Sequence, residues 1–212
     1  MLTVHHLGIS QSDRIVWLCE ELEIPYELVK YDRDPVTRLA PAPYKALHPS
    51  QTAPVITDGD VVLAESGAII DYIIARYGQG RLTLAAADPN FADYLYWFHF
   101  ANGSMMPAGM VDLVLSIVGL RDDPGIQPLR ARADRAYDLA ERRLGEAEYF
   151  AGPLFTAADI MKLFPLTTMR VFVPRDLAPY PTIRAYLARI GARPAFQRAA
   201  KKGDPDLTPL LS

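Results

Sequence analysis

The sequence predicts an α+β domain followed by an all-helical domain. Two observations indicate this order: short β-prone runs occur only before about residue 64, and the rest of the chain shows apolar residues at helical spacing. A third is the stretch of glycine, proline and small residues between the two parts. Because 212 residues suit two cores better than one, we expect a first domain over 1–80, a linker over 81–88 and a second domain over 89–212.

The chain starts with a predicted strand, helix and strand. Residues 2–7 are rich in strand formers, and residues 26–31 form a second β-prone run. Between them lies a helix closed by Pro25, whose apolar face has the spacing i, i+3, i+4, i+7: Ile15, Leu18, Cys19 and Leu22. Because a helix connects the two strands, we expect them to be parallel.

The rest of the first domain contains an irregular segment, a hairpin and a helix. Residues 35–50 hold four prolines, which remove backbone donors and disfavour a continuous helix. Residues 55–57 and 61–63 are β-prone and flank Asp58-Gly59-Asp60, a signal for a tight antiparallel turn. Ser66 is suited to cap a helix that runs to about Tyr77.

The second domain is predicted to contain only helices. We expect them over 90–118, 125–149, 156–172, 180–191 and 194–202. Thr156 and Asp159 fit a capping box, in which each side chain accepts from the other residue's backbone amide.

Composition excludes several classes of protein. The formal net charge of −3 gives no broad positive field, so we do not expect a nucleic-acid partner. Without an export signal or an apolar run of about 18 residues, we expect no membrane span and a cytoplasmic location. The single cysteine, Cys19, excludes a disulfide framework and is expected in the core. His5 and His6 point to opposite faces of a strand, so we expect no metal site.

Several motifs, in this order along the chain, resemble the cytosolic glutathione S-transferase family. They are Ser10-Gln11-x-x-Arg14 before Trp17-Leu18-Cys19-Glu20-Glu21-Leu22, Leu47-His48-Pro49, Thr52-Ala53-Pro54-Val55-Ile56, Glu65-Ser66-Gly67-Ala68-Ile69, Tyr94-x-Tyr96-Trp97-Phe98-His99 and Phe155-Thr156-x-x-Asp159. The chain looks most similar to the bacterial theta-like and fungal-like branch. The resemblance implies a thioredoxin-like, glutathione-binding first domain and a helical second domain that forms the pocket for the electrophile.

The resemblance also assigns a group that stabilises the glutathione thiolate. Ser10 precedes the first helix, where its hydroxyl and the helix terminus would favour thiolate over thiol. Ser12 is an alternative for this role, and Arg14 is a candidate for electrostatic assistance. From the residues alone, either serine would more simply be a helix cap.

Further residues are expected to hold the tripeptide. Glu65 would accept from the γ-glutamyl ammonium and Ser66 would hold the α-carboxylate at a helix N-terminus. Pro54 is expected to be cis, with the backbone of Ala53 pairing with the cysteinyl moiety. Gln51 and Thr52 stand where the family often has glycine and lysine, which weakens one carboxylate clamp. Gln51 or Thr52 would still donate hydrogen bonds to glutathione, and Lys45 or His48 is a candidate to supply the charge.

A third set of residues lies on the long helix that faces the electrophile in the family. Three alternatives are kept for these residues, namely the electrophile pocket, the core of the domain and a contact with a partner subunit. The residues are Trp97, Asn102, Met105 and Met106. The implied function is conjugation of glutathione, the co-substrate, to small hydrophobic electrophiles by a homodimer, with hydroperoxide reduction, dehalogenation or isomerisation as alternative chemistry. The rival hypothesis is an interaction or ligand-binding protein of the same fold without turnover.

Overall fold

The computed structural model describes residues 1–120 and 123–212, which form two compact units. Unit 1 contains Met1–Thr83 and Ala192–Pro209, and unit 2 contains Leu84–Gly191 and Leu210–Ser212. All of 89–212 was expected in the second domain, whereas the structure groups the last helix with the first unit. Residues 121–122 of that expected domain lie outside the described residues.

Unit 1 is built on a four-stranded mixed sheet in the order β2-β1-β3-β4. The strands are β1 (Leu2–Leu7), β2 (Glu27–Tyr31), β3 (Val55–Asp58) and β4 (Val61–Ala64). The β1–β2 pair is parallel and the β3–β4 pair is an antiparallel hairpin, which confirms both predicted pairings. Gly59 at the hairpin turn has φ of 59°, in the left-handed region that glycine adopts without steric cost.

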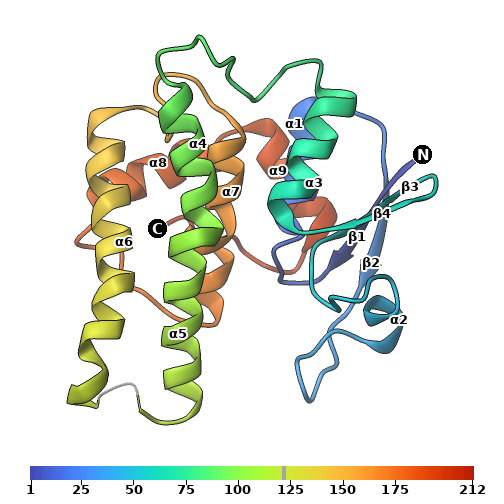
Figure 1. Ribbon diagram of the computed structural model, residues 1–212. Coiled ribbons are helices and arrows are strands. Elements are labelled where there is room, and N and C mark those ends of the chain that lie inside the picture. The colour runs from blue at the N-terminus through green and yellow to red at the C-terminus, as the bar shows by residue number, and fades with distance from the viewer. Residues whose placement is uncertain (121–122) are drawn as a thin grey trace. The chain divides into compact units, whose positions relative to one another are not determined.

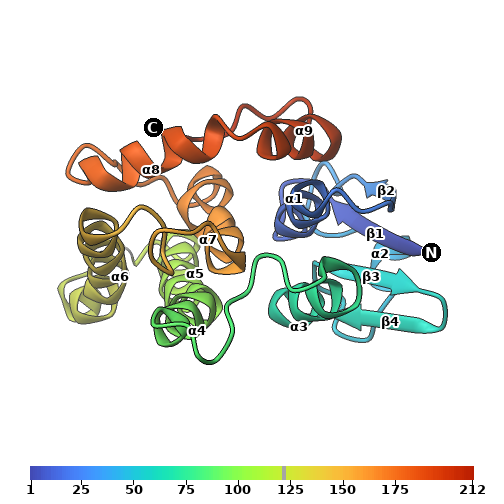
Figure 2. The ribbon, with the colours of Figure 1, turned by 90° about the horizontal axis from the view of Figure 1, so that it is seen from above.

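Helices cover both faces of this sheet. Figures 1 and 2 show α1 (Asp13–Leu22) and α3 (Ser66–Ile73) on one face and the short α2 (Ala42–Lys45) on the other. Tyr44 of α2 is buried in a cluster with Leu7, Val55 and Ala64. The π-helical turn η1 (Ile74–Gly78) follows α3, and α2 is the only α-helix in the proline-rich segment that we expected to be irregular.

The last helix, α9 (Pro194–Gly203), belongs to unit 1 because it packs along α1. The rings of Trp17 and Phe196 meet edge to face with centroids 5.5 Å apart. Glu20 accepts from Arg198 Nε at 2.9 Å and from Lys202 Nζ at 2.5 Å. Burial of both aromatic rings and neutralisation of the acidic face of α1 therefore fix α9 to the first unit.

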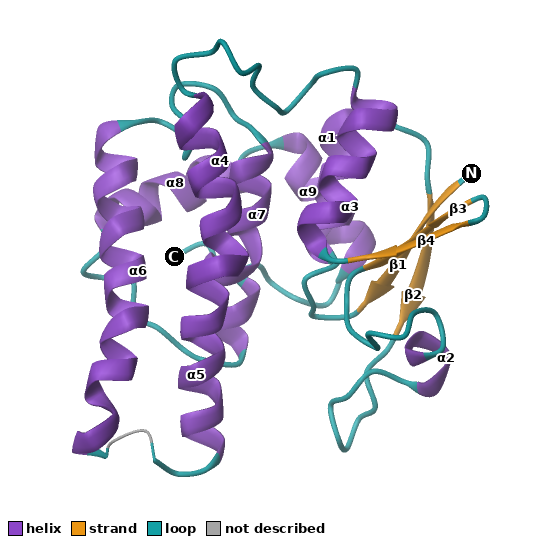
Figure 3. Ribbon diagram, viewed as in Figure 1, coloured by secondary structure: helices purple, strands orange, loops and turns teal. Residues whose placement is uncertain are grey.

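Unit 2 contains helices, and Figure 3 shows all the strands of the described residues in unit 1. Its elements are α4 (Phe91–Phe100), η2 (Ala101–Met105, π), α5 (Met106–Ile117), η3 (Pro124–Ile126, 3₁₀), α6 (Gln127–Glu146), α7 (Ala157–Leu166), η4 (Thr168–Val171, 3₁₀) and α8 (Pro181–Gly191). The helix α4 packs on α7, and α6 packs on both α5 and α8. Together with α9 of unit 1, these elements confirm the predicted helices.

Two features of unit 2 bear on the sequence predictions. The capping box is present: Asp159 Oδ2 accepts from the amide of Thr156 at 2.9 Å, and Thr156 Oγ1 accepts from the amide of Ala158 at 3.3 Å. The continuous helix Phe91–Ile117 is long and apolar enough to cross a membrane by length and composition alone. Packed helices of soluble proteins pass the same test, so this helix is weak evidence for a membrane span.

Candidate functional site

Three loops that carry predicted site residues meet at one edge of the sheet in unit 1. In the register of the strands, His5 of β1 lies opposite Val55, and Val55 lies opposite Ala64. The loop after β1, the chain before β3 and the chain after β4 therefore leave the sheet side by side. These segments contain Ser10, Ala53-Pro54 and Glu65-Ser66, so the fold brings the candidate residues of the first domain together.

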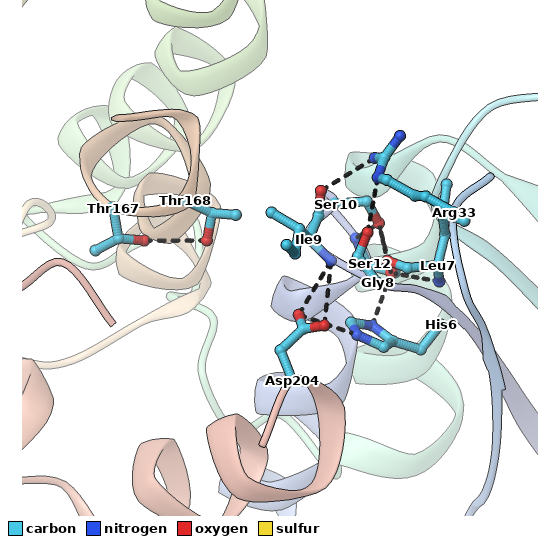
Figure 4. Close-up of polar contacts among 10 residues, drawn as sticks. All are labelled: His6, Leu7, Gly8, Ile9, Ser10, Ser12, Arg33, Thr167, Thr168 and Asp204. Atoms are coloured by element: carbon cyan, nitrogen blue, oxygen red, sulfur yellow. Dashed lines mark hydrogen bonds and ion pairs between the residues drawn. The ribbon is translucent and has the colours of Figure 1, made fainter. Parts of the chain in front are cut away.

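The two serines of the first loop form one hydrogen-bonded cluster (Figure 4). Ser10 Oγ donates to the carbonyl oxygen of Leu7 at 2.6 Å and lies 2.8 Å from Ser12 Oγ. Ser12 is at the N-cap position of α1 but makes no side-chain cap, because its hydroxyl accepts from the amide of Leu7 at 3.2 Å instead. Ser12 is 0% exposed and Ser10 is 4% exposed. Burial therefore favours Ser10 over Ser12 as the hydroxyl that a ligand reaches.

A histidine and an aspartate lie behind these serines. His6 Nδ1 is 2.8 Å from Ser12 Oγ, and His6 Nε2 is 3.2 Å from Asp204 Oδ2. Asp204 follows α9 and also accepts from the amide of Ile9, at 3.1 Å through Oδ1. Burial alone would raise the pKa of Asp204, but the hydrogen bonds that its carboxylate accepts from His6 and from the amide of Ile9 outweigh burial and lower that pKa.

An arginine holds the same loop from the other side. Arg33 donates from Nε to the carbonyl of Gly8 at 2.8 Å and from Nη2 to the carbonyl of Ile9 at 3.0 Å (Figure 4). Ile9 has φ of 51°, a left-handed conformation that is costly for a β-branched residue. The contacts of Arg33 and Asp204 with the Ile9 backbone hold the loop in this conformation.

The start of α3 forms the second part of the candidate site. Glu65, not Ser66, occupies the N-cap position, so the predicted Ser66 cap is wrong. Glu65 is exposed and has φ of 74°, which places its backbone in the left-handed region. Ser66 is buried, and its Oγ accepts from Arg14 Nη1 at 3.2 Å. Arg14 is itself fully buried, which lowers its pKa to about 10, so it keeps a positive charge beneath this helix terminus at neutral pH.

The chain before β3 confirms the predicted cis peptide bond, and the ligand-binding roles expected in this segment stay predictions. The Ala53–Pro54 peptide bond is cis, as predicted. Gln51 and Thr52 are exposed, and Thr52 Oγ1 donates to Ser50 Oγ at 3.2 Å. His48, one of the proposed substitutes for a lysine, has its Nδ1 2.9 Å from Ser50 Oγ.

The candidate electrophile residues lie in unit 2 and are mostly buried. Trp97 packs against Phe150, with ring centroids 5.1 Å apart, and Met106 belongs to a buried cluster of unit 2. Met105 is also buried, whereas Asn102 is partly exposed. This burial favours the core alternative for Trp97, Met105 and Met106.

The partners of the Ser10 loop were not predicted from the sequence. His6 was considered only as a metal ligand, and Arg33 and Asp204 were not singled out. Asp204 lies 198 positions from His6, and no local motif indicates such a contact. The alternation of side chains along β1 did correctly predict that His5 and His6 lie on opposite faces. His5 contacts Tyr31 and Thr57, whereas His6 contacts Ser12 and Asp204. Cys19 is buried, as expected, and burial raises its pKa.

Two models of protein families match the chain. Residues 5–81 match the glutathione S-transferase N-terminal domain, and residues 105–194 match the glutathione S-transferase C-terminal domain. Glutathione S-transferase 3 of Schizosaccharomyces pombe is 32% identical, with coverage of 100% of this chain and 92% of the relative. Glutathione S-transferase 1 of Saccharomyces cerevisiae is 28% identical, with 95% coverage of both chains.

Solved structures give the same family. A glutathione S-transferase from Actinobacillus pleuropneumoniae is 36% identical, with a TM-score of 0.87 and coverage of 96% of this chain and 93% of the other. A glutathione transferase from Phanerochaete chrysosporium, solved with oxidized glutathione, shares the fold at 22% identity, with a TM-score of 0.73 and coverage of 96% and 95%. With its mixed sheet, helical second unit and cis-proline loop, this chain belongs to the glutathione S-transferase family and is a glutathione transferase.

Proposed function

We propose that the chain binds glutathione on unit 1 and conjugates its thiolate to small hydrophobic electrophiles. The observation that carries the proposal is the geometry at the start of α3. An exposed carboxylate, Glu65, sits in a left-handed backbone beside Ser66, above the buried charge of Arg14. Strained backbone conformations cost about 1–3 kcal/mol and are concentrated at functional sites.

This geometry suits the γ-glutamyl end of glutathione, which carries an ammonium and a carboxylate on one carbon. Glu65 would accept from the ammonium, and Ser66 with the first amides of α3 would donate to the carboxylate. Arg14 adds positive charge through its contact with Ser66. The backbone of Ala53 would pair with the cysteinyl residue, and Gln51 and Thr52 would donate to the glycyl carboxylate without a formal charge.

Ser10 would then stabilise the thiolate. A shift of the bound thiol's pKa by one to two units corresponds to roughly 1.4–2.8 kcal/mol, which one charge-assisted hydrogen bond and a helix terminus can supply. The hydroxyl must turn from the carbonyl of Leu7 to the sulfur to do this. The thiolate attacks the electrophilic carbon, and the leaving group departs with the electron pair of the broken bond.

The test is calorimetric titration of glutathione into the wild type and three variants, with thiolate absorbance followed against pH. We expect Glu65→Ala to lose affinity and Ser10→Ala to bind normally while the thiol pKa rises. Glu23→Ala is the matched control, because Glu23 is likewise exposed with a left-handed φ of 51° but caps the far end of α1. Absence of binding by the wild type at millimolar glutathione would reject the proposal in favour of the non-catalytic alternative.

The same thiolate would also reduce hydroperoxides, with a second glutathione completing the disulfide. Parallel assays with an aryl halide and an organic hydroperoxide decide between the two activities. The assignment of this chain to the theta-like and fungal-like branch of the family stays a prediction.

We further propose a homodimer in the cytoplasm, supported by exposed apolar residues along α5. Val114 and Ile117 are 52% and 74% exposed, and Met110 lies on the same helix at 44%. Light scattering coupled to gel filtration measures the mass. We expect twice the 23.5 kDa of one chain, and a monomer at micromolar concentration would contradict this assembly.

A further inference from the structure

Within unit 1 a continuous chain of four side chains leads from Ser10 to the segment that follows α9. Ser10 Oγ is 2.8 Å from Ser12 Oγ, which is 2.8 Å from His6 Nδ1, and His6 Nε2 is 3.2 Å from Asp204 Oδ2 (Figure 4). Each of these distances is within hydrogen-bond range. We call Ser10, Ser12, His6 and Asp204 the relay.

The middle of the relay is closed to water. His6 and Ser12 are both 0% exposed, so bulk water does not reach the atoms between Ser10 and Asp204. Gly203 also packs closely against the His6 ring, because a Cβ at this position would lie only 3.3 Å from His6 Nε2, and this packing helps to exclude water. The side chains of the relay therefore form a hydrogen-bonded route from Ser10 to Asp204 that bulk water does not interrupt.

The charges around His6 determine its resting tautomer. Asp204 accepts a hydrogen bond from Nε2, so the neutral ring keeps its proton there and presents a lone pair at Nδ1 to the Ser12 hydroxyl. The charged groups that act on Asp204 include Lys30, which lies opposite His6 on β2, and Arg33. The carboxylate of Asp204 thus lies beside the position where a positive imidazole ring would form.

We propose that the relay accepts the thiol proton of bound glutathione and stores it on His6. The S–H bond breaks as the sulfur keeps the electron pair and Ser10 Oγ takes the proton. The original Ser10 proton, which at rest is donated to the carbonyl of Leu7, turns toward Ser12 Oγ and passes to it, and the original Ser12 proton passes to His6 Nδ1. The products are a thiolate that accepts from the Ser10 hydroxyl and an imidazolium paired with the carboxylate of Asp204.

This inference rests on the proposed glutathione site and goes beyond it, because thiolate stabilisation by Ser10 needs no proton acceptor. Ser12, His6 and Asp204 act on the sulfur only through Ser10, so they are positioning residues and not catalytic ones. If they merely held the loop, the proton on His6 would not depend on the thiol of the ligand. That difference separates the two roles.

The first experiment observes His6 directly in the wild type by nitrogen NMR of ¹⁵N-histidine. Four histidines give few signals, and a His6→Gln spectrum assigns the one in question. We expect His6 Nδ1 to become protonated when glutathione is added. S-methylglutathione, which has no thiol proton, should leave it unchanged. The same response to both ligands, or to neither while thiolate absorbance appears, would overturn the relay.

The second experiment measures the bound thiol pKa in Asp204→Asn and Ser12→Ala, with His5→Gln as the control on the same strand. We expect a rise of about one unit in both relay variants, a tenfold loss of thiolate below that pKa, and no change in the control. Binding of S-methylglutathione should stay unchanged, which shows that the loop is intact. An unchanged thiol pKa in both variants would reject the relay and leave the glutathione site standing. A wild type that forms no thiolate would reject both proposals, and if a variant does not fold, the NMR experiment decides.

Discussion

Replacing Phe196 by alanine tests whether α9 is an integral part of unit 1. Phe196 is 5% exposed and packs edge to face on Trp17, which is fully buried. Loss of a buried phenylalanine side chain in other proteins costs about 3–5 kcal/mol, because a cavity adds to the lost transfer free energy. Since whole domains are stable by only about 5–15 kcal/mol, we expect Phe196→Ala to remove about a fifth or more of the stability of unit 1.

The assay is urea unfolding followed by tryptophan fluorescence. The chain has two tryptophans, Trp17 in unit 1 and Trp97 in unit 2, so a Trp97→Phe background isolates the signal of unit 1. With a urea dependence of about 2 kcal/mol per molar, the expected loss moves the Trp17 midpoint down by about 1.5–2.5 M. Phe155→Ala, which removes an aromatic ring of unit 2 packed on Tyr149, serves as the control and should leave this midpoint in place.

A Trp17 midpoint that falls by less than about 0.5 M, close to 1 kcal/mol, would refute the reasoning. It would mean that α1 and the sheet are stable without the aromatic contact and that α9 is an appendage of unit 1.

Three further predictions concern single side chains. Burial raises the pKa of Cys19, so we expect no reaction with a disulfide reagent in the native protein and full reaction in denaturant; fast native labelling would contradict this. Burial alone would raise the pKa of Glu20, but hydrogen bonds from Lys202, Tyr26 and Arg198 outweigh it and lower the pKa. The resulting stability is present above the unfolded pKa of about 4.3 and is lost as pH falls through the folded one, so the urea-midpoint gap between wild type and Glu20→Gln should be wide at pH 7 and close in acid. Thr156→Ala should cost about 1 kcal/mol in urea unfolding of unit 2, and no loss would show that its cap is not stabilising.

Most of the fold was predictable because its signals are local. The turn Asp58-Gly59-Asp60 fixed the hairpin, and the helix between β1 and β2 fixed their parallel pairing. The π turns over 74–78 and 101–105 were missed because they interrupt helices whose apolar spacing is otherwise regular. The membership of α9 was missed because its ion pairs with Glu20 and Glu21 join residues more than 170 positions apart.

The candidate site, like the fold, was predictable only in part. The loops that carry Ser10, Ala53-Pro54 and Glu65 follow from strand order and motif. The roles within the loops depend on side-chain direction, which the sequence does not encode locally. Ser12 turns toward Leu7 and His6 instead of capping α1, and Glu65 takes the cap position that Ser66 was expected to hold.

The discontinuity of unit 1 has a consequence for synthesis on the ribosome. Chains are made from the N-terminus, and domains generally fold as units while the chain emerges. Unit 1 includes residues 192–209, so it is completed only after residues 84–191, nearly all of unit 2, have been translated. During that interval α9 is not yet present to pack on the face of α1 around Trp17 and Glu20. The nascent chain therefore exposes an apolar and acidic surface that is buried in the complete protein.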